Sequence, residues 1–104
     1  MKYKSSSLDL KIDELIIEDD RPAHISKHEI TIAEAKEVIK SDYVYIKSKY
    51  EKRWILIGKT KKGRFLSVII GERGEKNVFG LVTARPAHIT ERNFYKELKT
   101  TQGG

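Results

Sequence analysis

Residues 54–82 read WILIGKTKKGRFLSVIIGERGEKNVFGLV, and this stretch decides the fold. It contains three apolar runs, Trp54–Ile57, Phe65–Ile70 and Val78–Val82, which are separated by short segments rich in lysine and glycine. Runs of β-branched and aromatic residues between such turn segments are typical of strands joined by hairpins. A further run of this kind, Val44–Ile46, precedes them. The sequence therefore predicts an antiparallel meander of four strands.

Segments on both sides of the meander are predicted to be helical. Thr31 and Glu34 fit a capping box, and the residues behind them have apolar side chains at helical spacing as far as Lys40. A shorter helix over His24–His28 is expected after Pro22, and Thr90 is placed to cap a last helix that carries Phe94, Tyr95 and Leu98. The predicted fold class is α+β, with short N-terminal helices, a four-stranded antiparallel meander and a C-terminal helix, all helices lying on one face of the sheet. The short apolar run Ile12–Ile17 is interpreted as an edge strand or an extended arm.

The length and composition suit one small core. The chain has 104 residues, of which 38% are hydrophobic and 35% charged, so we expect a single domain over residues 1–104 with flexible segments at 1–8 and 99–104. No apolar run approaches the roughly 18 residues of a membrane-spanning helix, and no signal-peptide core follows the first residues. The absence of cysteine excludes disulfides, zinc–thiolate sites and thiol nucleophiles. We expect a cytoplasmic protein without a membrane partner.

Positive charge is concentrated in the second part of the chain. Residues 1–42 contain 7 Lys/Arg against 10 Asp/Glu, whereas residues 43–104 contain 14 against 5. Such an asymmetry favours a polyanionic partner. The predicted RNA-binding cations of the meander are Lys47, Lys49, Arg53, Lys59, Lys61 and Lys62, which we expect to form one patch. The aromatic residues among them, Tyr43, Tyr45, Tyr50 and Trp54, are expected either to stack on bases or, more simply, to pack against the sheet.

Two further groups of residues carry candidate chemistry. Arg85 lies at the predicted end of a strand and Arg92 in the first turn of the following helix, where the helix dipole disfavours a cation. Arg92 is therefore expected to have an assigned partner, either Glu91 or Glu97 or a phosphate, and the structural alternative is an Arg–carboxylate pair that locks the helix to the sheet. His24 and His28 stand four residues apart, but no third ligand accompanies them, so we predict no metal site and no cofactor. One histidine is expected to pack, and the other to be available as a base.

The chain resembles the BrnT-family toxins, which are ribonucleases of toxin–antitoxin modules with a RelE-like fold. The resemblance covers roughly residues 12–98 and departs from the usual family pattern at Glu29 and Pro86. The pieces that carry it, in chain order, are His24-Ile25-x-Lys27-His28 with Ile30 and Thr31, Glu34-Ala35-x-Glu37-Val38, Arg53-Trp54-x-x-Ile57-Gly58, Gly63-Arg64-Phe65-Leu66-x-Val68, Val82-Thr83-Ala84-Arg85 and Glu91-Arg92-x-x-Tyr95.

The resemblance implies metal-independent cleavage of RNA and neutralisation by a cognate antitoxin. The implied catalytic residues are Arg64 and Arg85, followed by His28, Glu91 and Arg92. In such a reaction the two arginines would stabilise the charge on phosphorus, and His28 or Glu91 would act as the base that accepts the proton of the ribose 2′-hydroxyl. Lys27 is a candidate for RNA contact and for the acid. Two alternatives stay open: a module that binds nucleic acid or the ribosome without catalysis, and an interaction protein whose basic face receives only an acidic antitoxin.

Overall fold

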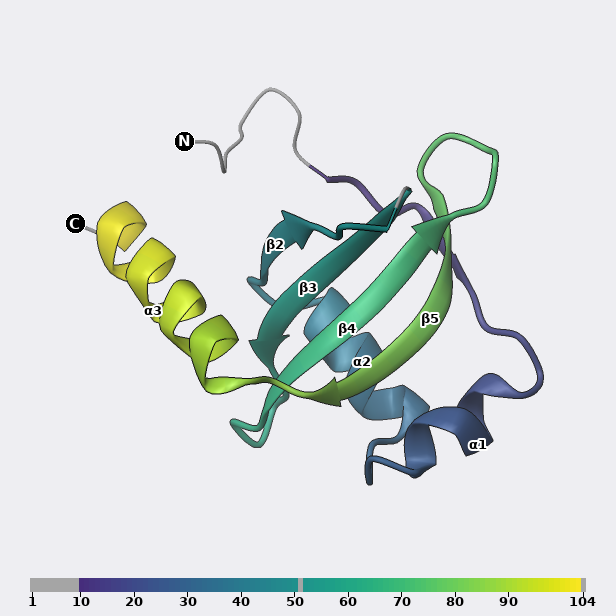
Figure 1. Cartoon of the computed structure of the whole chain (residues 1–104), viewed down its shortest axis with the longest axis horizontal. Helices are drawn as coiled ribbons and strands as arrows, with labels where there is room; N and C mark the ends of the chain where they lie inside the picture. Colours follow the sequence, from purple (N-terminus) through teal and green to yellow (C-terminus); the bar gives the residue numbers. More distant parts are fainter. Residues whose placement is uncertain (1–9, 51, 104) are drawn as a thin grey trace.

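The computed structural model describes residues 10–50 and 52–103, which form a five-stranded sheet and three helices (Figure 1). The segment 1–8, predicted to be flexible, lies outside the described residues. The elements in chain order are β1 (Glu14–Ile16), α1 (Arg21–Ser26), α2 (Ile32–Ile39), β2 (Val44–Lys47), β3 (Arg53–Lys59), β4 (Phe65–Glu72), β5 (Val78–Pro86) and α3 (Ile89–Gly103).

The predicted meander is present, but it is not the whole sheet. The strand order is β1-β5-β4-β3-β2, in which β2 to β5 pair in antiparallel fashion. β1 adds a fifth strand that runs parallel to β5, with Leu15 opposite Phe79. The prediction of a purely antiparallel four-stranded sheet is therefore wrong, because Ile12–Ile17 contributes an edge strand. Three paired residues are too few to show a strand periodicity, and the parallel orientation follows only from the path of the chain between β1 and β5.

The main core lies between one face of the sheet and the two N-terminal helices. Ile25 of α1 and Val38 of α2 are fully buried against Leu56, Val68 and other apolar residues of this face. The capping box is formed: the Thr31 hydroxyl oxygen accepts a hydrogen bond from the Glu34 backbone N–H (3.1 Å), and a Glu34 carboxylate oxygen accepts one from the Thr31 N–H (3.0 Å). α1 begins at Arg21, earlier than predicted, and ends at Ser26, so His28 lies outside it.

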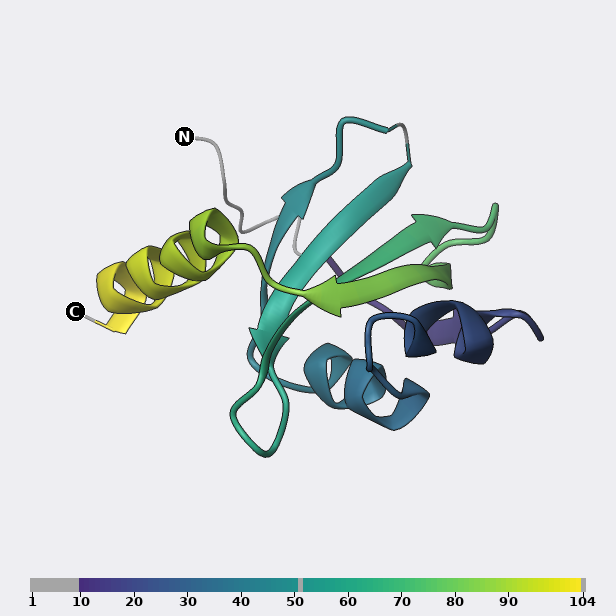
Figure 2. The ribbon, with the colours of Figure 1, turned by 60° about the horizontal axis from the view of Figure 1, so that its bottom comes forward.

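The third helix lies on the opposite face, so the prediction that all helices share one face is wrong. Successive residues of a strand point to opposite faces. Leu66 and Val68 belong to the main core, whereas Phe65 contacts Tyr95 and Ser67 contacts Glu91, both on α3. Figure 2 shows α3 on the other side of the sheet from α1 and α2. α3 continues through Gly103, across positions where a flexible tail was expected from the sequence.

Candidate functional site

A cluster of polar side chains is built where β5 ends and α3 begins. Ser67 and Arg85 are paired across β4 and β5 and point to the α3 face. The Arg85 guanidinium donates two hydrogen bonds of 2.8 Å to the two carboxylate oxygens of Glu91. The Ser67 hydroxyl (2.7 Å) and the His88 backbone N–H (2.8 Å) also donate to Glu91. Arg85 and Glu91, which the sequence placed in one group of candidate residues, are thus direct partners.

The four hydrogen bonds determine the charge state of Glu91. Burial of this side chain, only 11% exposed, raises the pKa of its carboxyl group. The hydrogen bonds from Arg85, the His88 backbone and Ser67 outweigh that effect and hold the pKa of Glu91 at about 2. Glu91 is therefore an ionised acceptor near neutral pH, and its negative charge raises the pKa of Arg85 in turn.

His24 reaches the same face from α1. Its Nε2 lies 3.1 Å from the Thr83 hydroxyl. Thr83 and Arg85 are two residues apart on β5 and therefore point to the same side of the sheet. Arg21 anchors α1 to this strand, since its guanidinium donates to the Val82 carbonyl oxygen and pairs with Asp20. The structure thus places His24, a residue that the sequence left without a definite role, beside Thr83, two residues before Arg85 on β5.

Arg64 directly precedes β4, and its side chain lies on the other face of the sheet from α3, against the residues that connect α1 and α2. Its Nη1 donates to the Glu29 carbonyl oxygen (2.7 Å) and lies 3.2 Å from both carboxylate oxygens of Glu34. These contacts join the β3–β4 turn to the capping box of α2. The expectation that Arg64 and Arg85 act on one phosphate is not supported by this placement, because their guanidinium groups have partners on different faces.

His28 accompanies Arg64 rather than Arg85. Its carbonyl oxygen accepts a hydrogen bond of 3.5 Å from Arg64 Nη2. The His28 and Lys27 side chains are exposed in the turn that follows α1. Glu29, the next residue, adopts a left-handed backbone with φ of 61°, a conformation for which glycine is the preferred residue.

The predicted RNA-binding cations do not form one patch. Lys47, Lys49 and Arg53 lie at the β2–β3 turn, whereas Lys59, Lys61 and Lys62 lie at the β3–β4 turn. β3 separates the two groups by seven residues, about 20 Å at the usual rise per residue. These cations are close together in the sequence, but the extended strand β3 places those before it far from those after it.

The aromatic residues of the meander mainly pack against one another. Tyr45 makes edge-to-face contacts with Tyr43 (6.3 Å between ring centroids) and Trp54 (5.9 Å), and Lys47 covers the Trp54 ring. The packing interpretation is confirmed for these three rings. Tyr50 differs, because it is 57% exposed in the β2–β3 turn.

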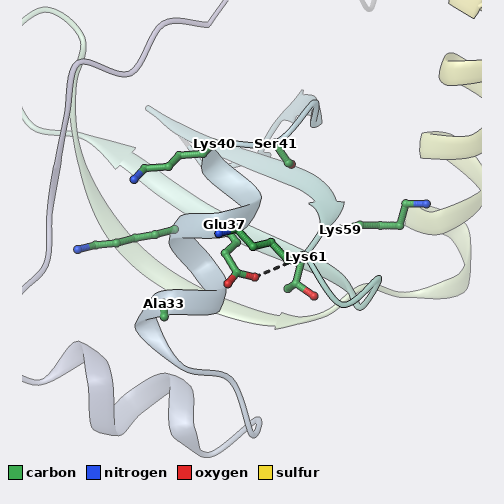
Figure 3. A pocket seen from close by; sticks show the side chains of 8 residues that line it. Ala33, Glu37, Lys40, Ser41, Lys59 and Lys61 are labelled. Atoms are coloured by element: carbon green, nitrogen blue, oxygen red, sulfur yellow. Dashed lines mark hydrogen bonds between the residues drawn. The ribbon is translucent and has the colours of Figure 1, made fainter.

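A basic surface that the sequence did not predict lies between α2 and the β3–β4 turn. A cavity of about 570 Å³ there is lined by lysine side chains from α2 and β3, among them Lys36 and Lys40, which the sequence analysis did not single out (Figure 3). Glu37 also lines it and accepts a hydrogen bond of 3.1 Å from the Lys61 backbone N–H. Helical spacing of Lys36 and Lys40 on α2 was the signal that could have indicated this surface.

Two general properties of the described residues bear on function. Within residues 10–50 and 52–103, no group of three or more His, Asp or Glu side chains is arranged to hold a metal ion. None of the described helices is long and apolar enough to cross a membrane.

Comparisons with known proteins give a family match and similarity to a solved structure. The model of the family described as "Ribonuclease toxin, BrnT, of type II toxin-antitoxin system" matches residues 18–91. A crystal structure of the ribonuclease toxin BrnT from Brucella abortus is similar with a TM-score of 0.58 at 17% sequence identity. The similarity covers 72% of this chain and 96% of that one, and at this identity it shows the fold alone. A search of curated protein sequences found no match.

Proposed function

The chain belongs to the BrnT family of type II toxin–antitoxin ribonuclease toxins, and we propose that it is an endoribonuclease toxin that needs no metal ion. The observation that carries the proposal is the family match over residues 18–91, which includes strands β2 to β5 and both members of the Arg85–Glu91 ion pair. The proposed partners are RNA as substrate and a cognate antitoxin as inhibitor.

The proposed reaction is attack of a ribose 2′-hydroxyl on the adjacent phosphodiester. A base accepts the 2′-hydroxyl proton, a bond forms between the 2′-oxygen and phosphorus, and the bond from phosphorus to the 5′-oxygen breaks. The leaving oxygen takes up a proton, so the products are a 2′,3′-cyclic phosphate and a free 5′-hydroxyl. Such a reaction requires a base, a proton donor and a fixed cation for the charge that develops on phosphorus.

Arg85 is the proposed cation. Its side chain is 25% exposed and its guanidinium is held by Glu91 at a fixed orientation, which is the arrangement that favours binding of an anionic oxygen without reorganisation. Glu91 is assigned an orienting role. A carboxylate with a pKa of about 2 is a weak base at neutral pH, and three different donors already occupy its oxygens.

A histidine is the proposed base. His24 contacts Thr83, two residues from Arg85 on β5, whereas His28 lies near Arg64. Placement therefore favours His24, although the family resemblance points to His28. Arg64 is assigned a structural role in this proposal, since its contacts are made within the fold.

Cleavage of a defined RNA by the purified protein in the presence of EDTA tests the proposal. We expect products with 2′,3′-cyclic phosphate ends, and no cleavage of an oligonucleotide in which every ribose carries a 2′-O-methyl group. Arg85→Gln is expected to lower the cleavage rate at least 100-fold while the protein remains folded. His24→Gln and His28→Gln, compared directly, identify the base. Intact RNA after incubation with folded wild-type protein over a range of pH and salt would refute the proposal.

A second candidate function is binding of RNA without cleavage. It is favoured by the Arg85–Glu91 pair, because the carboxylate offsets much of the positive charge that Arg85 would offer to a reacting phosphate. A phosphate would have to compete with this carboxylate. Binding with a steep salt dependence and no products in the same assay would select this candidate.

A further inference from the structure

We propose that Arg92, Lys96 and Lys59 form a binding site for an RNA backbone phosphate next to Arg85, on the same face of the sheet. This inference rests on the proposed function, because it assigns a subsite for the same substrate. The three cations surround the ring of Phe65. The Arg92 Cζ lies 5.6 Å, the Lys59 Nζ 5.5 Å and the Lys96 Nζ 6.0 Å from the ring centroid.

The first observation is that this group has no counter-ion. Arg21, Arg64, Arg73 and Arg85 all pair with a carboxylate within 4 Å. In the part of the chain that the structure describes, no carboxylate lies within that distance of Arg92, Lys59 or Lys96. Arg92 in addition has a buried Nε without a hydrogen-bond acceptor. A buried donor of a charged group without an acceptor is unfavourable, so the positive charge of Arg92 is not compensated within the fold.

The second observation is that the local structure disfavours the arrangement. Arg92 lies in the first turn of α3, where the helix dipole repels a cation. Arg92 and Lys96 are four residues apart on the helix, a spacing at which like charges destabilise it. Contact with the Phe65 ring offsets only part of this repulsion, since such contacts are weak at partly exposed sites. The three positive charges are thus unfavourable for the stability of the fold, and a bound polyanion would compensate them.

The third observation is the relation of this site to Arg85. Lys59 on β3 is paired with Phe65 on β4. The next residue of β4 on the same face is Ser67, which is paired with Arg85 on β5. Two residues along a strand span about 7 Å. Arg92 follows Glu91 directly in α3, so the same helical turn orients Arg85 and supplies the proposed phosphate ligand. An RNA strand bound at Arg85 would therefore pass the Phe65 cluster with a neighbouring phosphate.

The chemistry of the three residues fits a phosphate rather than a base. Arginine can donate two hydrogen bonds to phosphate oxygens, and the two lysines add point charges. The Phe65 ring is already in edge-to-face contact with Tyr95, with 5.3 Å between the centroids, and has cations near its face. Sequence-independent contact with the RNA backbone is the expected mode of binding, and its strength should fall steeply with salt.

The test measures binding of a single-stranded 2′-O-methyl RNA, which cannot undergo 2′-hydroxyl attack, by fluorescence anisotropy between 50 and 300 mM salt, roughly the range over which backbone contacts weaken strongly. We expect Arg92→Gln and Lys96→Ala each to weaken binding about three- to tenfold and to lower the slope of log Kd against log salt by about 0.7, as expected for one lost contact to a single strand. Arg92→Lys should retain most of the slope. Lys76→Ala, an exposed lysine in the β4–β5 turn, is the matched control and should bind like wild type.

The outcomes separate this inference from the proposed function. The expected decrease in slope in the two variants together with an inactive wild-type protein would support the subsite and refute cleavage. Normal cleavage by the wild type, with Arg92→Gln and Lys96→Ala binding like Lys76→Ala, would refute the subsite alone. The absence of measurable RNA binding by the wild type would also overturn it. Circular dichroism of each variant confirms that α3 is retained.

Discussion

The guanidinium of Arg85 and the carboxylate of Glu91 form a two-pronged ion pair, with both N–O distances 2.8 Å, that joins β5 to α3. Because the Arg85 side chain is 25% and the Glu91 side chain 11% exposed, loss of the carboxylate charge leaves a partly desolvated guanidinium without its ionic partner. Glu91→Gln is therefore expected to lower the free energy of unfolding by about 2–3 kcal/mol, measured by urea denaturation. Glu97→Gln, an exposed carboxylate on the same helix, should change it by less than about 0.5 kcal/mol. Equal effects of the two variants would contradict this prediction.

The low pKa of Glu91 also predicts how stability depends on pH. The folded-state pKa of about 2 lies below the ordinary value of 4.5, so ionised Glu91 stabilises the fold above about pH 4.5. This contribution, about 2–3 kcal/mol, is lost as the pH falls through 4.5 towards 2. The difference in unfolding free energy between wild type and Glu91→Gln should therefore shrink over this range. Glu34, whose pKa is lowered by hydrogen bonds from Thr31 and Arg64, titrates in both proteins and cancels in the comparison. A difference that stays constant from pH 6 to pH 2.5 would contradict the prediction.

Arg64 is expected to stabilise the connection between α1 and α2 rather than to act on RNA. Arg64→Ala removes the hydrogen bond to the Glu29 carbonyl and the contact with Glu34. Since the Arg64 side chain is about one-third exposed, we expect a loss of about 1 kcal/mol and faster amide hydrogen exchange over residues 27–31. Lys62→Ala, an exposed neighbour, should leave exchange unchanged. If Arg64→Ala abolishes RNA cleavage while exchange over 27–31 stays at the wild-type rate, Arg64 has a chemical role after all.

Local sequence signals predicted most of the fold. The capping box at Thr31, the hairpin turns and the end of a strand next to Arg85 depend on residues close in sequence, and the structure contains all three. β1 and the face occupied by α3 depend on long-range pairing. The alternation of side chains in β4 does indicate that the second face of the sheet is covered. Ser67 and Ile69 are buried although they point away from the core residues Leu66 and Val68, so another element has to cover them.

The candidate site was predicted less completely. The sequence identified the residue types, but it did not show on which face of the sheet each side chain has its partners. The sequence singled out Arg64 and Arg85 together because both match family motifs, yet one lies just before a strand and the other within one, and their partners are on opposite sides. The association of His24 with Thr83 spans 59 positions and has no local signal. Arg92 was different: its position against the helix dipole was visible in the sequence, and the structure shows that neither Glu91 nor Glu97 compensates it.

Gly58 provides a test of how closely α2 packs on β3. A Cβ atom at this position would lie 2.9 Å from the Ser41 Oγ and 3.2 Å from the Val38 Cγ1, and Val38 is fully buried. Gly58→Ala is therefore expected to lower the free energy of unfolding by about 1–3 kcal/mol, through displacement of the end of α2. Gly71→Ala in β4 is the matched control, because its Cβ would meet neighbours only at 3.5 Å and beyond. At that position the lower entropy of the unfolded chain should leave stability unchanged or raise it by up to about 1 kcal/mol.

Ser41→Ala removes the nearer of the two atoms that a Cβ at position 58 would meet, so the cost of Gly58→Ala should be smaller in that background. An unchanged cost in the double variant, measured by the same urea denaturation, would show that Val38 alone limits the space between α2 and β3.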